Sequence, residues 1–326
     1  MVDASNAVDN SMGLDVMTKI GIVGSGLIGR AWATIFATHG FKVSLYDVKP
    51  EEARAALDHI TANIGELANH GLASEPRQAL ARISVASDLA SAMQGAALVQ
   101  ESGPETLEAK RSTFEKLDAA APASCILASS TSAIVASKFT ENLKGRARCI
   151  VAHPVNPPHL VPVVELCGAP WTSADTKAKA LEVLRGVGQV PIDVKKEIDG
   201  FILNRLQGAL LAEAFRLVGE GYVSPQDCDK TLKDGLGLRW SFMGPFETID
   251  LNAPGGMADY CARYTGFYRD LQAKPASPEA FGEVNVARIL AEWGLPPDRA
   301  RLDARMAWRD RRLAALKAHK RSQPES

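Results

Sequence analysis

Long apolar runs, paired cysteines and an excess of either charge are all absent from this sequence of 326 residues. No stretch approaches the roughly 18 consecutive apolar residues of a membrane-spanning helix, so we expect no membrane partner. Lys and Arg number 37 against 38 Asp and Glu, which argues against a nucleic-acid partner, whose phosphates need a cationic surface. The five cysteines are scattered and never spaced C-x-x-C, which argues against a disulfide framework or a zinc site and favours a reducing, cytoplasmic location.

The N-terminal residues lack the basic start and apolar core of a secretory signal, and we interpret residues 1–18 as a flexible extension. The rest of the chain is long enough for two domains of roughly 100–200 residues each. The composition is that of a folded globular protein, with 46% hydrophobic and 23% charged residues.

Short apolar runs alternate with helical stretches through the first part of the chain. The run at 19–23 precedes a helical pattern at 27–39, and a β-branched run at 42–46 follows. Strands that alternate with helices need crossover connections, so this order predicts a parallel sheet. Further runs of strand length lie at 83–86, 97–100, 125–128 and 149–152, with 163–166 and 191–194 as candidate extensions of the same sheet.

This alternation ends near residue 199. Residues 200–218 are apolar on nearly every face, which is typical of a buried helix, and no convincing strand follows them. The sequence therefore predicts an α/β fold, in which a Rossmann-type domain with a mainly parallel sheet spans 19–198 and an all-α domain spans 199–326. We expect the helix at 200–218 to pack against the first domain or against a second subunit.

The C-terminal stretch at 299–321 carries nine Lys and Arg residues and only two Asp residues. Within it, Leu302, Met306, Leu313 and Leu316 approximate one helical stripe. In so neutral a chain a solvated helix face is the favoured interpretation, with an anion-binding patch as the alternative.

A glycine-rich turn joins the first predicted strand to the first predicted helix. Gly24-Ser25-Gly26-Leu27-Ile28-Gly29 has the spacing G-x-G-x-x-G, which indicates dinucleotide binding when it lies between a strand and a helix. Gly24 permits the tight turn, Gly26 lets the backbone approach a pyrophosphate, and Gly29 lets the helix pack closely on the sheet. The free N–H groups and the partial positive charge of the helix start favour the phosphates.

Asp47 ends the second predicted strand, 18 residues beyond Gly29. Taken alone it is a surface turn residue. After a glycine-rich turn, however, a carboxylate at this place accepts hydrogen bonds from the adenosine ribose and repels a 2′-phosphate, so the sequence predicts NAD rather than NADP as the cofactor. Lys49 lies nearby and weakens that preference.

His153 stands at the end of an apolar run and opens a proline-rich loop, where open α/β sheets bind ligands. Glu165 lies twelve residues later in an otherwise apolar run, and a carboxylate in such a run needs a partner. A His–Glu pair meets this need and makes the imidazole a better base, although a structural ion pair is the simpler interpretation. No two histidines have the i,i+4 spacing of a helical metal site, so we predict no metal.

Two further polar residues are candidates for contact with a substrate hydroxyl or carbonyl. Ser132 follows the run at 125–128 at the same edge of the predicted sheet, where it can also serve as a helix N-cap. Asn204 interrupts the apolar helix at 200–218, where backbone groups can also satisfy its amide.

Five stretches, taken together and in order, resemble the 3-hydroxyacyl-CoA dehydrogenase superfamily, and within it the lambda-crystallin and L-gulonate 3-dehydrogenase type. The resemblance runs from about residue 20 to residue 252, and more loosely to the C-terminus. The combination of motifs is far more specific than any one of them alone. The stretches are Gly26–Arg30 (GLIGR), Glu101–Glu105 (ESGPE), Val151–Pro158 (VAHPVNPP), Gly200–Leu206 (GFILNRL) and Met243–Pro245 (MGP).

The resemblance implies an NAD-dependent dehydrogenase with a helical domain that binds substrate and forms a homodimer. It implies that His153 is the catalytic base, that Glu165 is its partner, and that Ser132 and Asn204 lie beside the reacting hydroxyl. It also implies that two residues line the nicotinamide side of the cofactor site. These two, Glu105 and Lys110, otherwise read as an unremarkable pair on a helix surface.

The segment at 235–245 departs from the acyl-CoA enzymes because it is longer and contains Arg239. A guanidinium suits bidentate capture of a carboxylate, so we hypothesise that Arg239 binds a small free 3-hydroxy acid. Carnitine dehydrogenases share this pattern, so a carnitine or 3-hydroxyacyl-CoA substrate is an alternative. Outside enzymes, the alternative is a non-catalytic, crystallin-like nucleotide-binding protein.

Overall fold

The computed structural model describes residues 18–294 and 297–324, and the predicted extension at residues 1–17 lies outside them. The chain divides into two units. The first comprises the described residues up to Ile202 together with those from Met306 onward, and the second comprises the described part of Leu203–Arg305. The division at Ile202 lies close to the predicted boundary, whereas the sequence does not predict that the C-terminal residues join the first unit.

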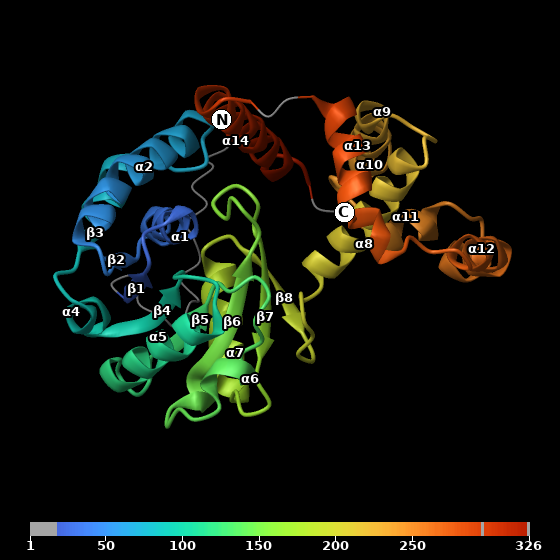
Figure 1. The fold of residues 1–326 in the computed structure, drawn as a ribbon. Helices are drawn as coiled ribbons and strands as arrows, with labels where there is room; N and C mark the ends of the chain where they lie inside the picture. The colour runs from blue at the N-terminus through green and yellow to red at the C-terminus, as the bar shows by residue number, and fades with distance from the viewer. Residues whose placement is uncertain (1–17, 295–296, 325–326) are drawn as a thin grey trace. The chain divides into compact units, whose positions relative to one another are not determined.

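The first unit is built on one eight-stranded sheet with the order β3-β2-β1-β4-β5-β6-β7-β8 (Figure 1). All neighbouring strands pair in parallel except β6 and β7, which are antiparallel. The predicted Rossmann-type, mainly parallel sheet is confirmed, including both candidate extensions. The strands are β1 (Lys19–Val23), β2 (Lys42–Tyr46), β3 (Ile83–Val85), β4 (Ala96–Glu101), β5 (Ile126–Ser129), β6 (Cys149–Pro154), β7 (Val163–Gly168) and β8 (Val190–Val194).

Helices cover both faces of this sheet, which is why its strands are apolar runs rather than alternating ones. Successive residues of one strand enter different cores, as Leu98 and Val99 of β4 do. The first core receives α1 (Leu27–Thr38), α2 (Pro50–Asn69) and α7 (Ala174–Gly186), and the second receives α4 (Leu89–Met93), α5 (Leu107–Ala120) and α6 (Ser137–Thr140). The short helices α3 (Pro76–Ala81) and η1 (Arg146–Arg148) complete this part.

The described residues of the second unit form helices and turns, as expected for an all-α domain. Its first helix, α8, buries only Val218 and Gly219, and Leu206 is 66% exposed. The described residues of the second unit therefore leave much of the apolar surface of α8 uncovered, and the predicted packing of this helix on the first domain or on a second subunit stays a prediction. The elements are α8 (Leu203–Gly219), α9 (Pro225–Lys230), the π-helical turn η2 (Thr231–Leu236), α10 (Gly237–Trp240), α11 (Pro245–Leu251), α12 (Gly256–Gln272), η3 (Pro278–Phe281) and α13 (Glu283–Trp293).

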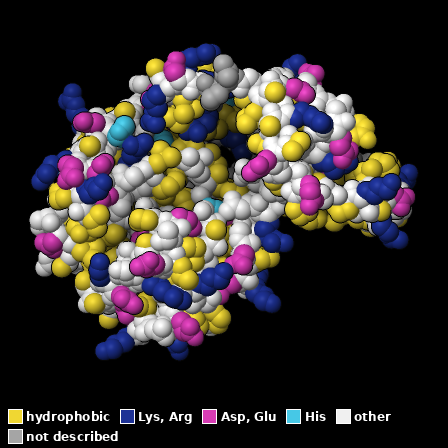
Figure 2. Space-filling model, in the orientation of Figure 1, with side chains coloured by type: hydrophobic (Ala, Val, Ile, Leu, Met, Phe, Trp, Pro, Cys, Tyr) yellow, Lys and Arg dark blue, Asp and Glu magenta, His cyan; other side chains and the backbone are white. Residues whose placement is uncertain are grey.

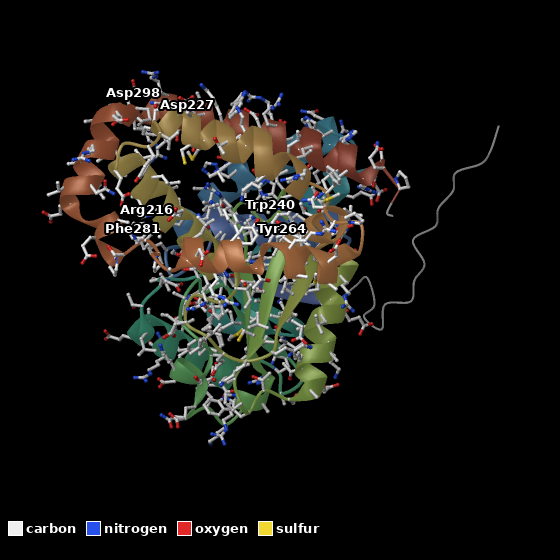
Figure 3. All side chains as sticks on the ribbon, turned by 90° about the vertical axis from the view of Figure 1, so that its right-hand side faces the viewer. Arg216, Asp227, Trp240, Tyr264, Phe281 and Asp298 are labelled. Carbon is white, nitrogen blue, oxygen red and sulfur yellow. The ribbon has the colours of Figure 1, made fainter. Side chains whose placement is uncertain are left out.

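Hydrophobic side chains are frequent on the surface of the second unit, and Figure 2 shows them over α11 and α12. Trp240 and Tyr264, labelled in Figure 3, are both more than two-fifths exposed. Phe215 and Phe281 instead pack against each other within the unit, with ring centroids 5.2 Å apart. Exposed apolar area on this scale is typical of a surface that another protein covers.

The last helix, α14 (Arg299–Arg321), brings the cationic C-terminal stretch back to the first unit. Ala314 is buried against Leu67 of α2 and Leu160 of the β6–β7 loop. Lys317 donates a hydrogen bond from Nζ to the carbonyl oxygen of His159 at 3.0 Å, and burial lowers the pKa of this lysine to about 8. The interpretation of this stretch as a solvated helix face is therefore wrong around Ala314 and Lys317.

Lys317→Met is expected to remove one component of the pH dependence of stability. Lys317 titrates near 10.5 in the unfolded chain and at about 8 in the folded protein, so the unfolded chain binds more protons between these values. The parent protein therefore gains stability as pH rises from about 8 toward 10.5, by at most about 3 kcal/mol, and the variant lacks this gain. Urea unfolding of both proteins across this range measures it, and identical pH profiles would contradict the prediction.

Candidate active site

The glycine-rich turn between β1 and α1 is held by the end of β2. Gly24 has a φ of 96°, a conformation that favours glycine, and its N–H donates to the carbonyl oxygen of Tyr46. Ser25 donates twice to Asp47 Oδ2, from its backbone N and from Oγ, each at 2.8 Å. Asp47, which the sequence predicts to bind the adenosine ribose, therefore also holds the glycine-rich turn in place through Ser25.

The space around the three glycines fits a dinucleotide phosphate. A Cβ at Gly29 would stand 1.8 Å from the carbonyl oxygen of Gly24, so only glycine lets α1 approach the turn so closely. A Cβ at Gly26 would meet nothing within 4 Å, and Gly26 is an N-cap with no side-chain hydrogen bond to the first turn. The helix start thus presents N–H groups to open space, as a pyrophosphate requires.

His153 and Glu165 face each other across the antiparallel pair β6 and β7, in directly opposed register. His153 Nδ1 lies 2.8 Å from Glu165 Oε2, and the two residues are only 6% and 1% exposed. An ionised carboxylate can only accept, so this contact places a proton on Nδ1 and leaves Nε2 as the basic nitrogen. The predicted pairing of these residues is therefore present in the structure.

A turn that the sequence analysis overlooked holds the other oxygen of Glu165. The backbone N–H of Ile202 donates to Glu165 Oε1 at 2.7 Å. Gly200 and Phe201 reach this position with φ of 78° and 49°. A left-handed conformation at a non-glycine residue costs on the order of 1–2 kcal/mol. Phe201 is fully buried, with its ring 5.6 Å from that of His153, so this strained residue packs directly against the imidazole.

Ser132 lies in residues 130–133, called here the serine turn, which follows β5. Glu105 Oε1 accepts hydrogen bonds from Thr131 Oγ1 at 2.5 Å, from Ser132 N at 2.9 Å and from Ala133 N at 3.2 Å. Since β5 pairs with β6, this turn follows the strand beside the one that carries His153. The structure thus brings Glu105 to Ser132, a contact that the sequence did not indicate.

Lys110 is not a helix-surface residue. It is 1% exposed, and its Nζ lies 2.9 Å from both carboxylate oxygens of Glu101, which is also 1% exposed. Nζ also donates to the carbonyl oxygen of Gly103 at 3.3 Å and lies 3.9 Å from Glu105 Oε2. Sequence reasoning missed Glu101. A carboxylate next to an apolar run singled out Glu165, and Glu101, the last residue of the apolar strand β4, carries a similar signal.

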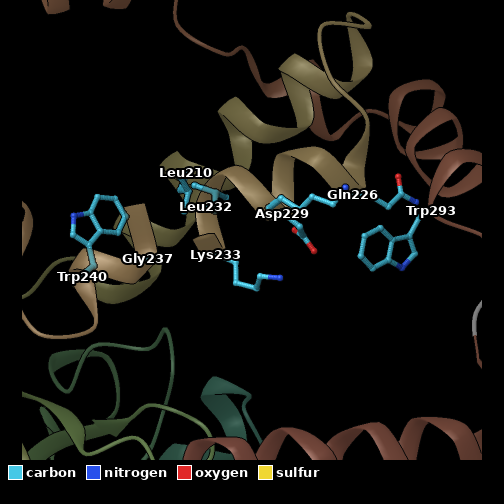
Figure 4. A pocket seen from close by; sticks show the side chains of 9 residues that line it. Leu210, Gln226, Asp229, Leu232, Lys233, Gly237, Trp240 and Trp293 are labelled. Atoms are coloured by element: carbon cyan, nitrogen blue, oxygen red, sulfur yellow. The ribbon is translucent and has the colours of Figure 1, made fainter. Parts of the chain in front are cut away.

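The remaining predicted residues belong to the second unit, so their contact with a substrate stays a prediction. Asn204 is the second residue of α8, and Arg239 lies on α10 with an exposed side chain. Next to Arg239, Trp240 lines a cavity of about 680 Å³ within this unit, together with Trp293 (Figure 4).

The described residues contain no group of three or more His, Cys, Asp or Glu side chains placed to hold a metal ion. Among the helices described, none combines the length and apolarity needed to cross a membrane. The five cysteines are free, and burial raises the pKa values of Cys125 and Cys149 to about 12 and that of Cys167 to about 11, so these three thiols stay protonated near neutral pH.

Gly29→Ala and Gly26→Ala are expected to separate stability from cofactor affinity. The first forces a methyl group into the Gly24 carbonyl and should destabilise the fold by about 1–3 kcal/mol or more. The second meets no neighbour, so it should leave thermal unfolding unchanged while weakening NADH binding, because its methyl faces the phosphate approach. Thermal unfolding and fluorescence titration with NADH test both, and full affinity in Gly26→Ala would refute the placement of the pyrophosphate.

Two family models together match most of the chain. The model of the 3-hydroxyacyl-CoA dehydrogenase NAD-binding domain matches residues 19–198, and that of the C-terminal domain matches residues 200–289. Lambda-crystallin of Oryctolagus cuniculus is 45% identical over 309 residues, covering 91% of this chain and 95% of that protein. L-carnitine dehydrogenase of Streptomyces griseus subsp. griseus is 38% identical over 241 residues, covering 74% and 71%.

A solved structure extends this similarity across both units. The NAD⁺-dependent 5-formyl-3-hydroxy-2-methylpyridine 4-carboxylic acid 5-dehydrogenase has a TM-score of 0.81 and 26% identity, and the match covers 94% of this chain and all of that one. The turn of the first unit fits a dinucleotide, and the matching model is that of an NAD-binding domain. The chain therefore belongs to the NAD-dependent 3-hydroxyacyl-CoA dehydrogenase family.

Proposed function

We propose that this protein oxidises the 3-hydroxyl of a small free hydroxy acid with NAD⁺, as an L-gulonate 3-dehydrogenase does. The observation that carries the proposal is the buried contact of 2.8 Å between His153 Nδ1 and Glu165 Oε2. It provides an oriented base in the same unit as a turn that fits the cofactor. A base and a hydride acceptor are the two requirements of alcohol oxidation.

The chemistry divides between cofactor and protein. NAD⁺, when bound, supplies the hydride acceptor. His153 Nε2 accepts the proton of the substrate hydroxyl, since its Nδ1 is committed to Glu165. Glu165 stabilises the positive charge that the imidazole then carries, and the N–H of Ile202 holds this carboxylate in place.

Ser132 and Asn204 position the reacting oxygen in this mechanism. Glu105 accepts a hydrogen bond from the backbone N–H of Ser132, and this contact constrains the position of the serine side chain. Asn204 lies two residues beyond Ile202, whose N–H holds Glu165. We assign both residues the task of holding the substrate oxygen toward Nε2.

A free acid is favoured over a thioester as substrate for two reasons. Arg239 has an exposed guanidinium, and within the described residues it forms no ion pair that would occupy it. The similarity to a lambda-crystallin covers 91% of the chain, against 74% for a carnitine dehydrogenase, and the structurally similar pyridine carboxylic acid dehydrogenase acts on an acid. Carnitine and 3-hydroxyacyl-CoA remain the alternative substrates, and a non-catalytic crystallin-like role is the alternative outside enzymes.

A homodimer in a reducing, cytoplasmic compartment completes the proposal. The exposed apolar face of α8 and the exposed aromatic side chains of α12 support a second copy as the covering partner. Five free cysteines, three of them buried, support a reducing environment.

His153→Gln is expected to lower kcat by about 10²–10⁴-fold, because the base is lost. NADH affinity should stay nearly unchanged, since the substitution does not touch the glycine-rich turn. The substrate is identified from rates followed at 340 nm with L-gulonate, 3-hydroxybutyrate, carnitine and a 3-hydroxyacyl-CoA. The matched control is His59→Gln, which changes an exposed histidine of α2. Substantial turnover by His153→Gln at neutral pH would rule out the assigned base, and no turnover by the parent protein on any substrate would favour the non-catalytic role.

Arg239→Ala is expected to raise KM for the best acid substrate by about 10–100-fold, the loss typical of a hydrogen-bonded charge. kcat should change much less, because the carboxylate is bound alike in ground and transition states. Steady-state kinetics measure the split, with Arg77→Ala on the exposed side of α3 as the control. An unchanged KM in Arg239→Ala would remove Arg239 from the site.

A further inference from the structure

We propose that Glu101 is a positioning residue for the reaction, and that it fixes the serine turn through Ser129 and Lys110. This inference rests on the proposed function, because it assigns Glu101 an effect on Ser132. Glu101 itself is buried behind the turn and acts only through its neighbours.

Both oxygens of Glu101 are saturated with donors. Oε1 accepts from Gly103 N at 2.6 Å and from Lys110 Nζ at 2.9 Å. Oε2 accepts from Lys110 Nζ at 2.9 Å and from Ser129 Oγ at 2.7 Å. Four hydrogen bonds from three residues, Gly103, Lys110 and Ser129, hold this carboxylate in a single orientation.

The first connection to the serine turn passes through Ser129, the fully buried last residue of β5. Its hydroxyl donates to Glu101 and accepts a hydrogen bond from Thr131 N at 3.2 Å. The hydroxyl hydrogen can point to only one acceptor, so the Glu101 carboxylate determines that the lone pairs face Thr131. Glu101 therefore fixes the backbone where the serine turn begins.

The second connection passes through Lys110 and Glu105. Lys110 Nζ lies 3.9 Å from Glu105 Oε2, whereas the hydrogen bonds from Thr131 Oγ1, Ser132 N and Ala133 N all end on the other oxygen, Oε1. The ammonium group of Lys110 thus attracts Glu105 Oε2, and Glu105 Oε1 is left to accept the hydrogen bonds of the serine turn. Because Glu101 holds Lys110 bidentately, it also sets the direction from which Lys110 acts on Glu105.

Stability alone does not account for such a network. A buried ion pair contributes little net stability compared with apolar side chains of the same size, because both charges lose their hydration. What the network provides is a fixed geometry at the carboxyl ends of β4 and β5, next to the strand that carries His153. A displacement of about 1 Å at such a site can lower a rate by about 100-fold.

Ser129→Ala and Glu101→Gln test the proposal by hydrogen exchange. Each should speed amide exchange in the peptide that contains Ser132 and Ala133. Ser129→Ala removes the acceptor of Thr131 N, where the turn begins, and Glu101→Gln releases Lys110, which orients Glu105. Ser44→Ala, which removes another buried hydroxyl of the same sheet, should leave that peptide protected. This measurement needs no substrate, so it reports on the network even if the proposed activity is absent. Unchanged protection in both variants would overturn the inference.

A double-mutant cycle with Ser132→Ala tests whether the effect reaches catalysis. In the parent background, Ser129→Ala and Glu101→Gln should lower kcat by about 10–100-fold with little change in the affinity for NADH. In the Ser132→Ala background, neither should lower kcat further, because the residue through which they act is gone. Fully additive effects would show that Glu101 supports the fold in general and would overturn the positioning role.

Glu101→Gln leaves Lys110 buried without its main counterion, so the single variant can unfold. The double variant Glu101→Gln/Lys110→Met removes both charges and should recover the thermal midpoint of the parent protein. Exchange at Ser132 should remain fast in that variant, and this readout does not depend on the predicted role of Lys110 at the cofactor. Recovery of protection together with stability would contradict the proposal, because a merely structural pair would be replaced without loss.

Discussion

The site depends on one hydrogen bond, between His153 Nδ1 and Glu165 Oε2, and this bond depends on a reversal of strand direction. Six of the seven strand pairings are parallel, and a parallel neighbour of β6 would arrive only after a long crossover. The antiparallel return of β7 brings a residue twelve positions later directly opposite His153. Two groups that would be costly to bury singly thereby satisfy each other.

The same bond constrains the segment that leaves the first unit. Glu165 takes a second hydrogen bond from Ile202 N, the last residue of the first unit in this region, and Gly200 and Phe201 adopt left-handed conformations to provide it. Burial of the Phe201 ring against His153 offsets the strain at this residue. The strain thus occurs where the chain fixes both members of the pair.

Local patterns in the sequence predicted the parts of the structure that local physics determines. The strand runs, the helix starts and the glycine-rich turn follow from hydrophobic periodicity and backbone freedom. Local patterns could not show that Lys110 is buried or that Glu105 holds Ser132, because those contacts join residues 9 to 28 positions apart in the chain. The return of α14 to the first unit was missed for a related reason, since a helix face does not reveal which surface covers it.

Two buried carboxylates of the same sheet, Glu101 at the end of β4 and Glu165 within β7, are held in similar ways but are paired with different bases. Glu101 and Glu165 are each 1% exposed, and each accepts a backbone N–H and a basic side chain. The partner of Glu101 is a lysine that has no proton-transfer role in the proposed reaction, so we assign this pair to geometry alone. The partner of Glu165 is a histidine, which becomes positive only when it takes a proton. Because burial strengthens that interaction, in the proposed reaction the carboxylate would stabilise the imidazole most when the substrate hydroxyl gives up its proton.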